Sequence, residues 1–363
     1  MPWPPLRSLA TVLILLSPCL APWQSLLSAE DSGPPARSET SAGERFTFHS
    51  SDGIHELSAA CFPAVDPKGV LVMVNGRSES WLKYVPLYQK LNRVGYTVYS
   101  YDHRGQGLSP RLVPGNPQIG YVDDFSAYSR DLGLFLDEVR RREDSGKISL
   151  IGNSMGGAVI VDWISGHDDR GIDKIVLCSP MFRIKTAPWP EPIARIVLGV
   201  LHFLGQGASY APGEGDASTT EPFEHNRVTS SRERWEEILQ FRKNHPESVI
   251  GGASVDWVIR ALDSTARIRS AAGCMGPETL ILEAGHDSFV IPFHPQASAA
   301  HLGPRIILFP QGRHELLMES EPIRQEAIRA ILSLLESPDT VEAITLDQRG
   351  GKRLSSETTP PTP

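Results

Sequence analysis

The stretch Ile148-Ser149-Leu150-Ile151-Gly152-Asn153-Ser154-Met155-Gly156-Gly157 carries the clearest indication of the fold. Its apolar first half predicts a buried strand, and the apolar residues 155–164 predict a helix. Between them lies the pattern G-x-S-x-G, which in this context is typical of a sharp turn that presents a nucleophilic serine. The two glycines of the pattern remove side chains that would clash in such a turn. The stretch therefore predicts Ser154 as a nucleophile between a strand and a helix.

Predicted strands and helices alternate along most of the remaining chain as well. This alternation predicts an α/β fold with a mostly parallel sheet and helices on both of its faces. We expect strands at 69–74, 96–101, 147–151, 174–178, 279–282 and 305–309, helices at 124–141, 155–164 and 322–335, and an antiparallel edge hairpin at 46–48 and 56–62. The alternation stops between about residues 185 and 275. An apolar helical stripe at 193–204 and a charged helix at 232–242 predict a helical cap inserted over one end of the sheet.

Both ends of the chain differ from this domain, which spans about residues 45–336. An apolar run follows a weakly positive start within residues 1–29, which predicts a signal peptide or an N-terminal membrane anchor; the alternative is a buried helix. We therefore expect an exported or membrane-anchored protein, periplasmic or in the cell envelope if bacterial. Residues 30–44 predict a linker, and residues 337–363 predict a disordered tail.

Composition excludes several classes of protein. The 363 residues are 40% hydrophobic and 21% charged, so the chain can bury a core and is not wholly disordered. Lys and Arg number 35 against 43 Asp and Glu, a net charge of −8 without a long basic run, which argues against a nucleic-acid partner. The cysteines are too widely separated for a disulfide scaffold or a paired-cysteine zinc site; they are Cys19, Cys61, Cys178 and Cys274.

A serine nucleophile needs a base that takes its proton, and a histidine usually supplies it. His314 follows the last predicted strand, in a loop that would reach the same edge of the sheet as Ser154. The alternative role for His314 is to cap a helix. Asp287 follows the strand at 279–282 and is expected to orient this histidine. An Asx-turn role for Asp287, and Glu283 as the acid, remain open alternatives.

Two backbone N–H groups are expected to stabilise the oxygen that becomes negative during ester or amide cleavage. Met155, directly after the nucleophile, supplies one, and Arg77, in the loop after the strand at 69–74, supplies the other. The Arg77 side chain is expected either to meet a phosphate or to be solvated. Met318 stands where an H-E-x-x-H zinc motif needs its second histidine, so no metal site is predicted there.

Five motifs, in this order, resemble the α/β-hydrolase fold, and more narrowly its bacterial lysophospholipase and monoacylglycerol lipase branch, the serine aminopeptidase S33 type. They are Asn75-Gly76-Arg77-Ser78-Glu79-Ser80, Asp102-His103-Arg104-Gly105-Gln106-Gly107-Leu108-Ser109, Gly152-Asn153-Ser154-Met155-Gly156-Gly157, Gly285-His286-Asp287 and His314-Glu315. The G-R-x-E-S form of the first motif is similar to bacterial lysophospholipases, whereas monoacylglycerol lipases have a His-Gly form. Asn153 departs from the family, where histidine is common before the nucleophile. In the second motif, Asp102 and Arg104 are expected to brace the turn.

The resemblance implies a serine hydrolase that cleaves carboxylic esters of lysophospholipids or monoacylglycerols through a Ser-His-Asp triad and an acyl-enzyme, without metal or cofactor. The expected partner is a small-molecule lipid ester, with contact between the apolar cap helix and a membrane surface. The alternatives are a broad-specificity carboxylesterase or peptidase of the same fold, or a catalytically silent binding protein.

Overall fold

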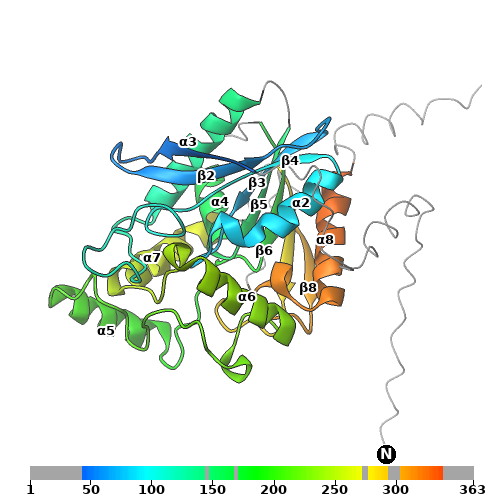
Figure 1. Cartoon of the computed structure of the whole chain (residues 1–363). Coiled ribbons are helices and arrows are strands. Elements are labelled where there is room, and N and C mark those ends of the chain that lie inside the picture. Colours follow the sequence, from blue (N-terminus) through cyan, green and yellow to red (C-terminus); the bar gives the residue numbers. More distant parts are fainter. Residues whose placement is uncertain (1–42, 144–146, 167–170, 272–276, 293–302, 338–363) are drawn as a thin grey trace, which may run out of the picture. The chain divides into compact units, whose positions relative to one another are not determined.

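The computed structural model describes residues 43–143, 147–166, 171–271, 277–292 and 303–337. Eight strands form one sheet in the order β1-β2-β4-β3-β5-β6-β7-β8 (Figure 1). The strands are β1 (Glu44–His49), β2 (Glu56–Phe62), β3 (Gly69–Val74), β4 (Tyr96–Tyr101), β5 (Ile148–Asn153), β6 (Ile172–Cys178), β7 (Glu278–Ala284) and β8 (Arg305–Phe309). β1 and β2 pair antiparallel, as do β2 and β4, and all other neighbours pair parallel. The predicted parallel sheet with an antiparallel edge hairpin is confirmed.

Helices cover both faces of this sheet. They include α2 (Val85–Arg93), α3 (Ser126–Arg142), α4 (Met155–Ser165) and α8 (Glu321–Leu335). From β3 to β4 the chain moves one way along the sheet, and from β4 to β5 and on to β6 it moves the other way. Because crossovers between parallel strands are right-handed, α2 lies on one face, and α3 and α4 lie on the other. α8 packs against β6 and β7.

The central strands are buried from end to end. Every residue of β4 and β5 is buried, as is all of β3 after Gly69. Strands with helices on both faces have no solvent-facing side, which explains why their sequences are continuous apolar runs instead of alternating patterns. The core includes an aromatic group in which Phe135 packs 5.0 Å from Phe48 and 4.6 Å from Tyr101, between ring centroids.

The segment between β6 and β7 forms a helical cap. Its helices are α5 (Glu191–Phe203), α6 (Arg232–Asn244) and α7 (Val255–Ala271). α5 and α6 are the two helices that the sequence predicts there; α5 lies at the lower left of Figure 1 and α6 in its lower middle. α7 packs against both α5 and α4, so it connects the cap to the helical layer on the sheet. Neither α7 nor α2 is predicted from the sequence.

Several predictions concern the ends of the chain. The predicted signal peptide or anchor at residues 1–29 lies outside the described residues. The same holds for nearly all of the predicted linker at 30–44 and of the predicted tail at 337–363. Within the described ranges, no helix is long and apolar enough to cross a membrane.

Candidate active site

Ser154 lies in a strained turn between β5 and α4. Its φ is 49° and its ψ is −111°, a region that residues with a side chain seldom adopt. The turn is fixed by its backbone: Ser154 N–H donates to the carbonyl of Cys178 at 2.8 Å, and the Ser154 carbonyl accepts from the N–H of Met181 at 2.9 Å. The hydroxyl is therefore presented at the carboxyl edge of the sheet.

The glycines around Ser154 are required by close packing. A Cβ at Gly156 would lie 2.0 Å from the carbonyl oxygen of Val74, and a Cβ at Gly152 would lie 2.7 Å from the Cα of Gly157. Non-bonded carbon atoms do not approach backbone atoms this closely. The first turn of α4 can therefore reach the strands beneath it only if these two positions carry no side chain.

The structure brings Ser154, His314 and Asp287 together as three residues joined by two consecutive hydrogen bonds. His314 Nε2 lies 2.8 Å from Ser154 Oγ, and His314 Nδ1 lies 2.6 Å from Asp287 Oδ2. A carboxylate only accepts hydrogen bonds, so Nδ1 carries the ring proton. Nε2 is then free to accept from the serine hydroxyl. This is the geometry that general-base activation of a serine requires.

Asp287 has a second set of contacts. Its Oδ1 accepts from the backbone N–H groups of Phe289 at 2.7 Å and Val290 at 2.9 Å. The Asx-turn and the contact with His314 are therefore both present, one on each carboxylate oxygen. Burial by itself would raise the pKa of Asp287, but His314 and the two amides lower the pKa below its ordinary value. The carboxyl group is thus ionised at neutral pH.

The two predicted oxyanion amides have no partner among the described residues. Met155 N–H belongs to the first turn of α4, where no intrahelical acceptor exists, and no turn or loop bond within the described ranges uses it. In the loop after β3, Gly76 N–H donates to Glu79 Oε2 at 2.5 Å, and Ser78 N–H donates to Gln106 Oε1 at 2.7 Å. No hydrogen bond between described residues uses the intervening N–H of Arg77.

The Arg77 side chain connects this loop to the cap. Its Nη2 donates to the carbonyl of Gly251 at 2.8 Å, and its guanidinium lies over the Trp257 ring, 5.2 Å from the centroid. The expectation of a solvated arginine is therefore wrong, because the guanidinium packs between the loop and cap residues.

The motif at residues 102–109 is architectural, as predicted. Asp102 accepts from the Ser80 hydroxyl at 2.8 Å and from the backbone N–H groups of Trp81 and Leu108 at 2.7 Å each. Arg104 forms a two-pronged ion pair with Asp131 on α3, with both nitrogen–oxygen distances at 2.6 Å. The Asp102 contacts hold the loop after β4 against the loop after β3, and the Arg104 pair holds it against α3.

A buried charge cluster that is not predicted from the sequence lies beside the site. Lys83 Nζ lies 2.9 Å from Glu79 Oε1 and 2.5 Å from Glu315 Oε2. Glu79 also accepts from the side-chain amide of Asn153, the residue before the nucleophile. The spacing of four residues between Glu79 and Lys83 is a signal that could have indicated the first pair, since such residues are neighbours on a helical turn.

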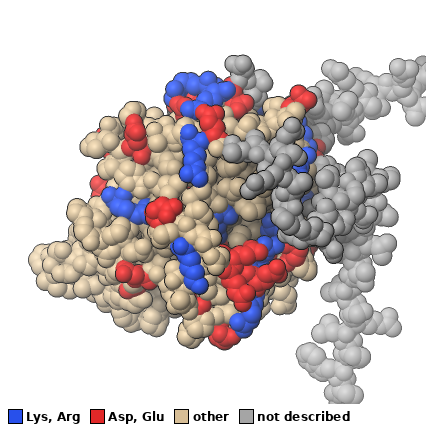
Figure 2. Space-filling model, in the orientation of Figure 1, with Lys and Arg blue, Asp and Glu red and all other residues tan. Residues whose placement is uncertain are grey.

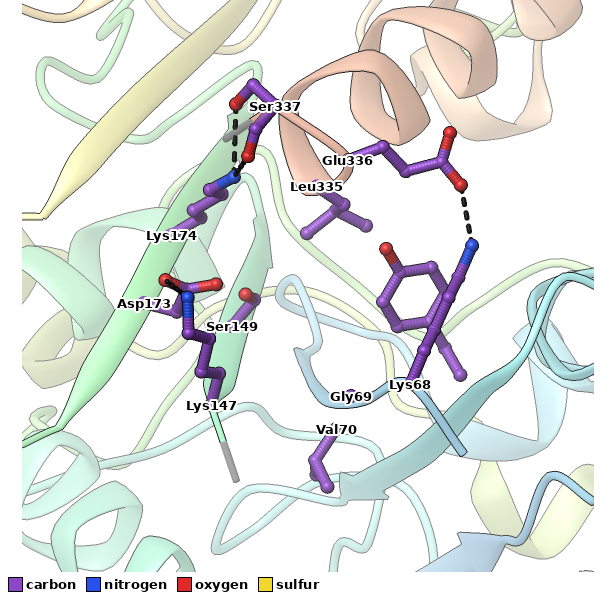
Figure 3. A pocket seen from close by; sticks show the side chains of 11 residues that line it. Lys68, Gly69, Val70, Lys147, Ser149, Asp173, Lys174, Leu335, Glu336 and Ser337 are labelled. Carbon is purple, nitrogen blue, oxygen red and sulfur yellow. Dashed lines mark hydrogen bonds and ion pairs between the residues drawn. The ribbon is translucent and has the colours of Figure 1, made fainter. Parts of the chain in front are cut away.

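A separate cavity of about 490 Å³ lies at the other end of the strands (Figure 3). Ser149, near the start of β5, lines it; five residues of strand, roughly 16 Å, separate Ser149 from Ser154. Lys174 Nζ donates there to the carbonyl of Leu334 at 2.9 Å, and Lys68 pairs with Glu336 at 2.6 Å. This cavity is distinct from the candidate active site. Among the described residues, no group of three or more His, Cys, Asp or Glu side chains could hold a metal.

The sheet order, the cap between β6 and β7, and the turn at Ser154 define an α/β-hydrolase fold. Within this class, the family model described as "Serine aminopeptidase, S33" matches residues 65–321, and the chain belongs to that family.

Curated relatives agree with this assignment. A probable lysophospholipase L2 of Haemophilus influenzae is 27% identical over 301 residues, which cover 79% of this chain and 91% of the relative. Lysophospholipase L2 of Escherichia coli K12 is 32% identical over 276 residues, which cover 72% of this chain and 79% of the relative. A monoacylglycerol lipase of Mycolicibacterium smegmatis is 24% identical over 183 residues, which cover 50% of this chain and 62% of the lipase. The chain is accordingly a serine ester hydrolase of this family.

Solved structures support the fold. A thermostable carboxyl esterase from Bacillus coagulans aligns with a TM-score of 0.63 and 18% identity. The alignment covers 81% of this chain and 98% of the esterase. A monoglyceride lipase from Saccharomyces cerevisiae also aligns with a TM-score of 0.63, at 15% identity. The alignment covers 84% of this chain and 98% of the lipase.

Proposed function

We propose that the chain cleaves the carboxylic ester of a lysophospholipid or a monoacylglycerol and releases a fatty acid. The observation that carries this proposal is the hydrogen-bonded line from Asp287 through His314 to Ser154, with distances of 2.6 and 2.8 Å. A binding protein has no need of all three groups in this arrangement.

In the first half of the reaction, Ser154 Oγ attacks the ester carbonyl while His314 Nε2 takes the hydroxyl proton. The carbonyl oxygen becomes negative, and the N–H groups of Met155 and Arg77 donate to it. His314 then passes its proton to the leaving alcohol, the glycerol-containing part of the lipid. The acyl group stays on the serine as an ester. Asp287 stabilises the imidazolium that forms between the two proton transfers.

In the second half, a water molecule replaces the alcohol. His314 takes a proton from the water as the water oxygen attacks the acyl-enzyme. The resulting tetrahedral intermediate collapses, the bond to Ser154 Oγ breaks, and the proton returns to the serine. The products are the free fatty acid and the regenerated hydroxyl group.

The substrate class is supported by the relatives and by the cap. The lysophospholipase L2 of Escherichia coli and the probable lysophospholipase L2 of Haemophilus influenzae match over 72% and 79% of this chain. The outer face of α5 carries large apolar side chains with high exposure: Ile196 at 67%, Val200 at 53% and Phe203 at 87%. Figure 2 shows the lower-left end of the molecule, where α5 lies in Figure 1, as a largely uncharged surface. We propose that this face contacts the membrane that holds the lipid substrate.

The location of the protein is a further part of this proposal. The apolar run within residues 1–29 supports export or membrane anchoring. Fractionation of the native host, with detection of the full chain, is expected to find it outside the cytoplasm or in the membrane fraction. Recovery in the cytoplasmic fraction alone would contradict this part.

The experiment that tests the activity measures fatty-acid release from lysophosphatidylcholine and from a monoacylglycerol, with Ser154→Ala as the matched control. We expect release by the wild type and none by the variant, and preference for the lysophospholipid would assign the head group. A fluorophosphonate is expected to label the wild type at Ser154 only. Labelling without lipid hydrolysis would favour a small-ester esterase or a peptidase, and absence of both would favour a silent binding protein.

A further inference from the structure

The buried charge cluster formed by Glu79, Lys83 and Glu315 takes part in none of the steps above. The side chains of Glu79 and Lys83 are only 4% and 8% exposed, and that of Glu315 is 13% exposed. Water screens such charges weakly, so the distances of 2.9 and 2.5 Å from Lys83 Nζ to the two carboxylates represent strong interactions. The three groups therefore act on one another as a single unit.

Glu79 joins two of the loops that carry the candidate site. Its Oε2 accepts from Gly76 N–H at 2.5 Å, and both of its oxygens lie 3.1 Å from Asn153 Nδ2. Gly76 directly precedes Arg77, whose N–H is the second oxyanion donor, and Asn153 directly precedes Ser154. One carboxylate is thus in contact with the oxyanion loop and with the nucleophile turn.

Lys83 extends the connection to the third loop. Its ammonium group bridges Glu79 and Glu315, and Glu315 directly follows His314. Arg77, Ser154 and His314 are therefore each the covalent neighbour of a residue that belongs to the cluster or is in contact with it. The Tyr84 hydroxyl donates to Glu79 Oε1 at 2.5 Å and completes the set of donors around that carboxylate.

Glu79 and Lys83 keep their charges despite burial. Burial by itself would raise the pKa of Glu79, but Lys83, Tyr84 and Asn153 lower it below its ordinary value. Burial by itself would lower the pKa of Lys83, but Glu315 and Glu79 raise it above its ordinary value. Glu79 and Lys83 are thus both charged at neutral pH.

We propose that Glu79, Lys83 and Glu315 are positioning residues that align the oxyanion loop, the nucleophile turn and the histidine loop relative to one another. This inference rests on the proposed function, because it concerns how the same groups are held. Removal of one partner of a buried ion pair leaves the other charge unpaired and destabilises the fold. A displacement of reacting groups by about 1 Å also slows the reaction of the folded protein about a hundredfold. We therefore expect loss of a charge in the cluster to lower the rate of the folded protein in addition to its stability.

The test uses the full chain with the substitutions Glu79→Gln, Lys83→Met and Glu315→Gln, which keep the shapes and remove the charges. The measurements are kcat and KM on a soluble p-nitrophenyl ester, the rate of fluorophosphonate labelling, and unfolding by urea. We expect Glu79→Gln to lower kcat and the labelling rate by about ten- to a hundredfold while KM stays within about twofold. Lys83→Arg is expected to retain more of the rate than Lys83→Met, because it keeps the positive charge.

Asp131→Asn is the matched control. Asp131 is fully buried and pairs with Arg104, whose side chain is 7% exposed, so this substitution also breaks a buried ion pair. We expect it to lower stability in urea and to leave kcat and the labelling rate of the folded protein within about twofold.

The outcomes separate this inference from the proposed function. A folded Glu79→Gln variant with wild-type kcat and labelling rate would overturn the inference alone. The same loss of rate in Asp131→Asn would also overturn it, because the loss would then follow from any broken buried pair. Failure of the wild type to be labelled would overturn the proposed function and this inference with it. If the wild type is labelled but cleaves no lipid, the labelling rates still test the inference.

Discussion

Asp287 illustrates how one side chain serves both local structure and the candidate chemistry. One carboxylate oxygen closes the turn at Phe289 and Val290, and the other orients His314. The two contacts fix the carboxylate from opposite sides, so the imidazole has one preferred tautomer. An aspartate in a solvated turn would leave the ring free to rotate.

Replacing Asp287 by asparagine is expected to reduce kcat on ester substrates by about a thousand- to ten-thousandfold. The reason is that the asparagine NH₂ group favours the tautomer in which Nε2 carries the proton, so His314 cannot accept from Ser154. The measurement is steady-state hydrolysis of a soluble ester, with circular dichroism as the check on folding. A folded variant with more than about a tenth of the wild-type rate would exclude this role for Asp287.

The same substitution is expected to change how stability depends on pH. Because the pKa of Asp287 is lower in the folded protein than in the unfolded chain, the carboxylate stabilises the fold above its ordinary pKa. This contribution is lost as the pH falls through the lower, folded-state pKa. Urea unfolding of the wild type and Asp287→Asn is therefore expected to show a gap in stability that narrows from neutral to acidic pH. A gap that is constant with pH would contradict the assignment of the shift.

At the scale of elements, close packing of α4 against the sheet depends on a position without a side chain. The first turn of α4 passes over the end of β3, where a Cβ at Gly156 would lie 2.0 Å from the Val74 oxygen. By contrast, Gly199 lies within α5, and a Cβ there would meet nothing within 4 Å. A side chain is therefore excluded at Gly156 by close packing, whereas the space around Gly199 would admit one.

Gly156→Ala is expected to lower the free energy of unfolding by at least about 3 kcal/mol or to prevent folding, because the backbone of β3 must move. Gly199→Ala is the matched control, and it is expected to raise stability by about 0.5–1 kcal/mol through helix propensity. Urea unfolding of both variants beside the wild type provides the measurement. Equal effects of the two substitutions would show that packing at Gly156 is not the constraint.

At the scale of the whole molecule, the proposed membrane contact concerns the exposed apolar face of α5. Ile196→Glu combined with Phe203→Glu is expected to weaken binding to phospholipid vesicles at least about tenfold, because each side chain buries apolar area worth about 1.5–3 kcal/mol. Vesicle co-sedimentation measures this binding. Fluorophosphonate labelling in solution checks that the double variant remains folded.

The control for this surface is a lone exposed apolar residue elsewhere. Val65 is 90% exposed, in the connection between β2 and β3, and Val65→Glu is expected to leave vesicle binding unchanged. If Val65→Glu weakens binding as much as the α5 variant, added negative charge explains the effect, and α5 is not the contact surface.

The sequence by itself determined the features that depend on local or periodic patterns. The strands from β3 to β7 are largely apolar runs because both faces of the sheet are covered there. The turn at Ser154 is recognisable because glycines lie two residues before and two residues after the serine. The order of Ser154, Asp287 and His314 along the chain follows from where parallel strands end. These signals need only neighbouring residues, so they can be read without knowing the fold.

Only the tertiary structure decided which distant residues meet. Lys83 reaches Glu315 across 232 positions of the chain, and Arg77 reaches Gly251 across 174. Such contacts leave no periodic signal, because each joins single residues that are far apart in the sequence and belong to no common repeat. The pairing exists because the sheet brings the carboxyl ends of its strands to one edge, and burial there makes each charge depend on its partner.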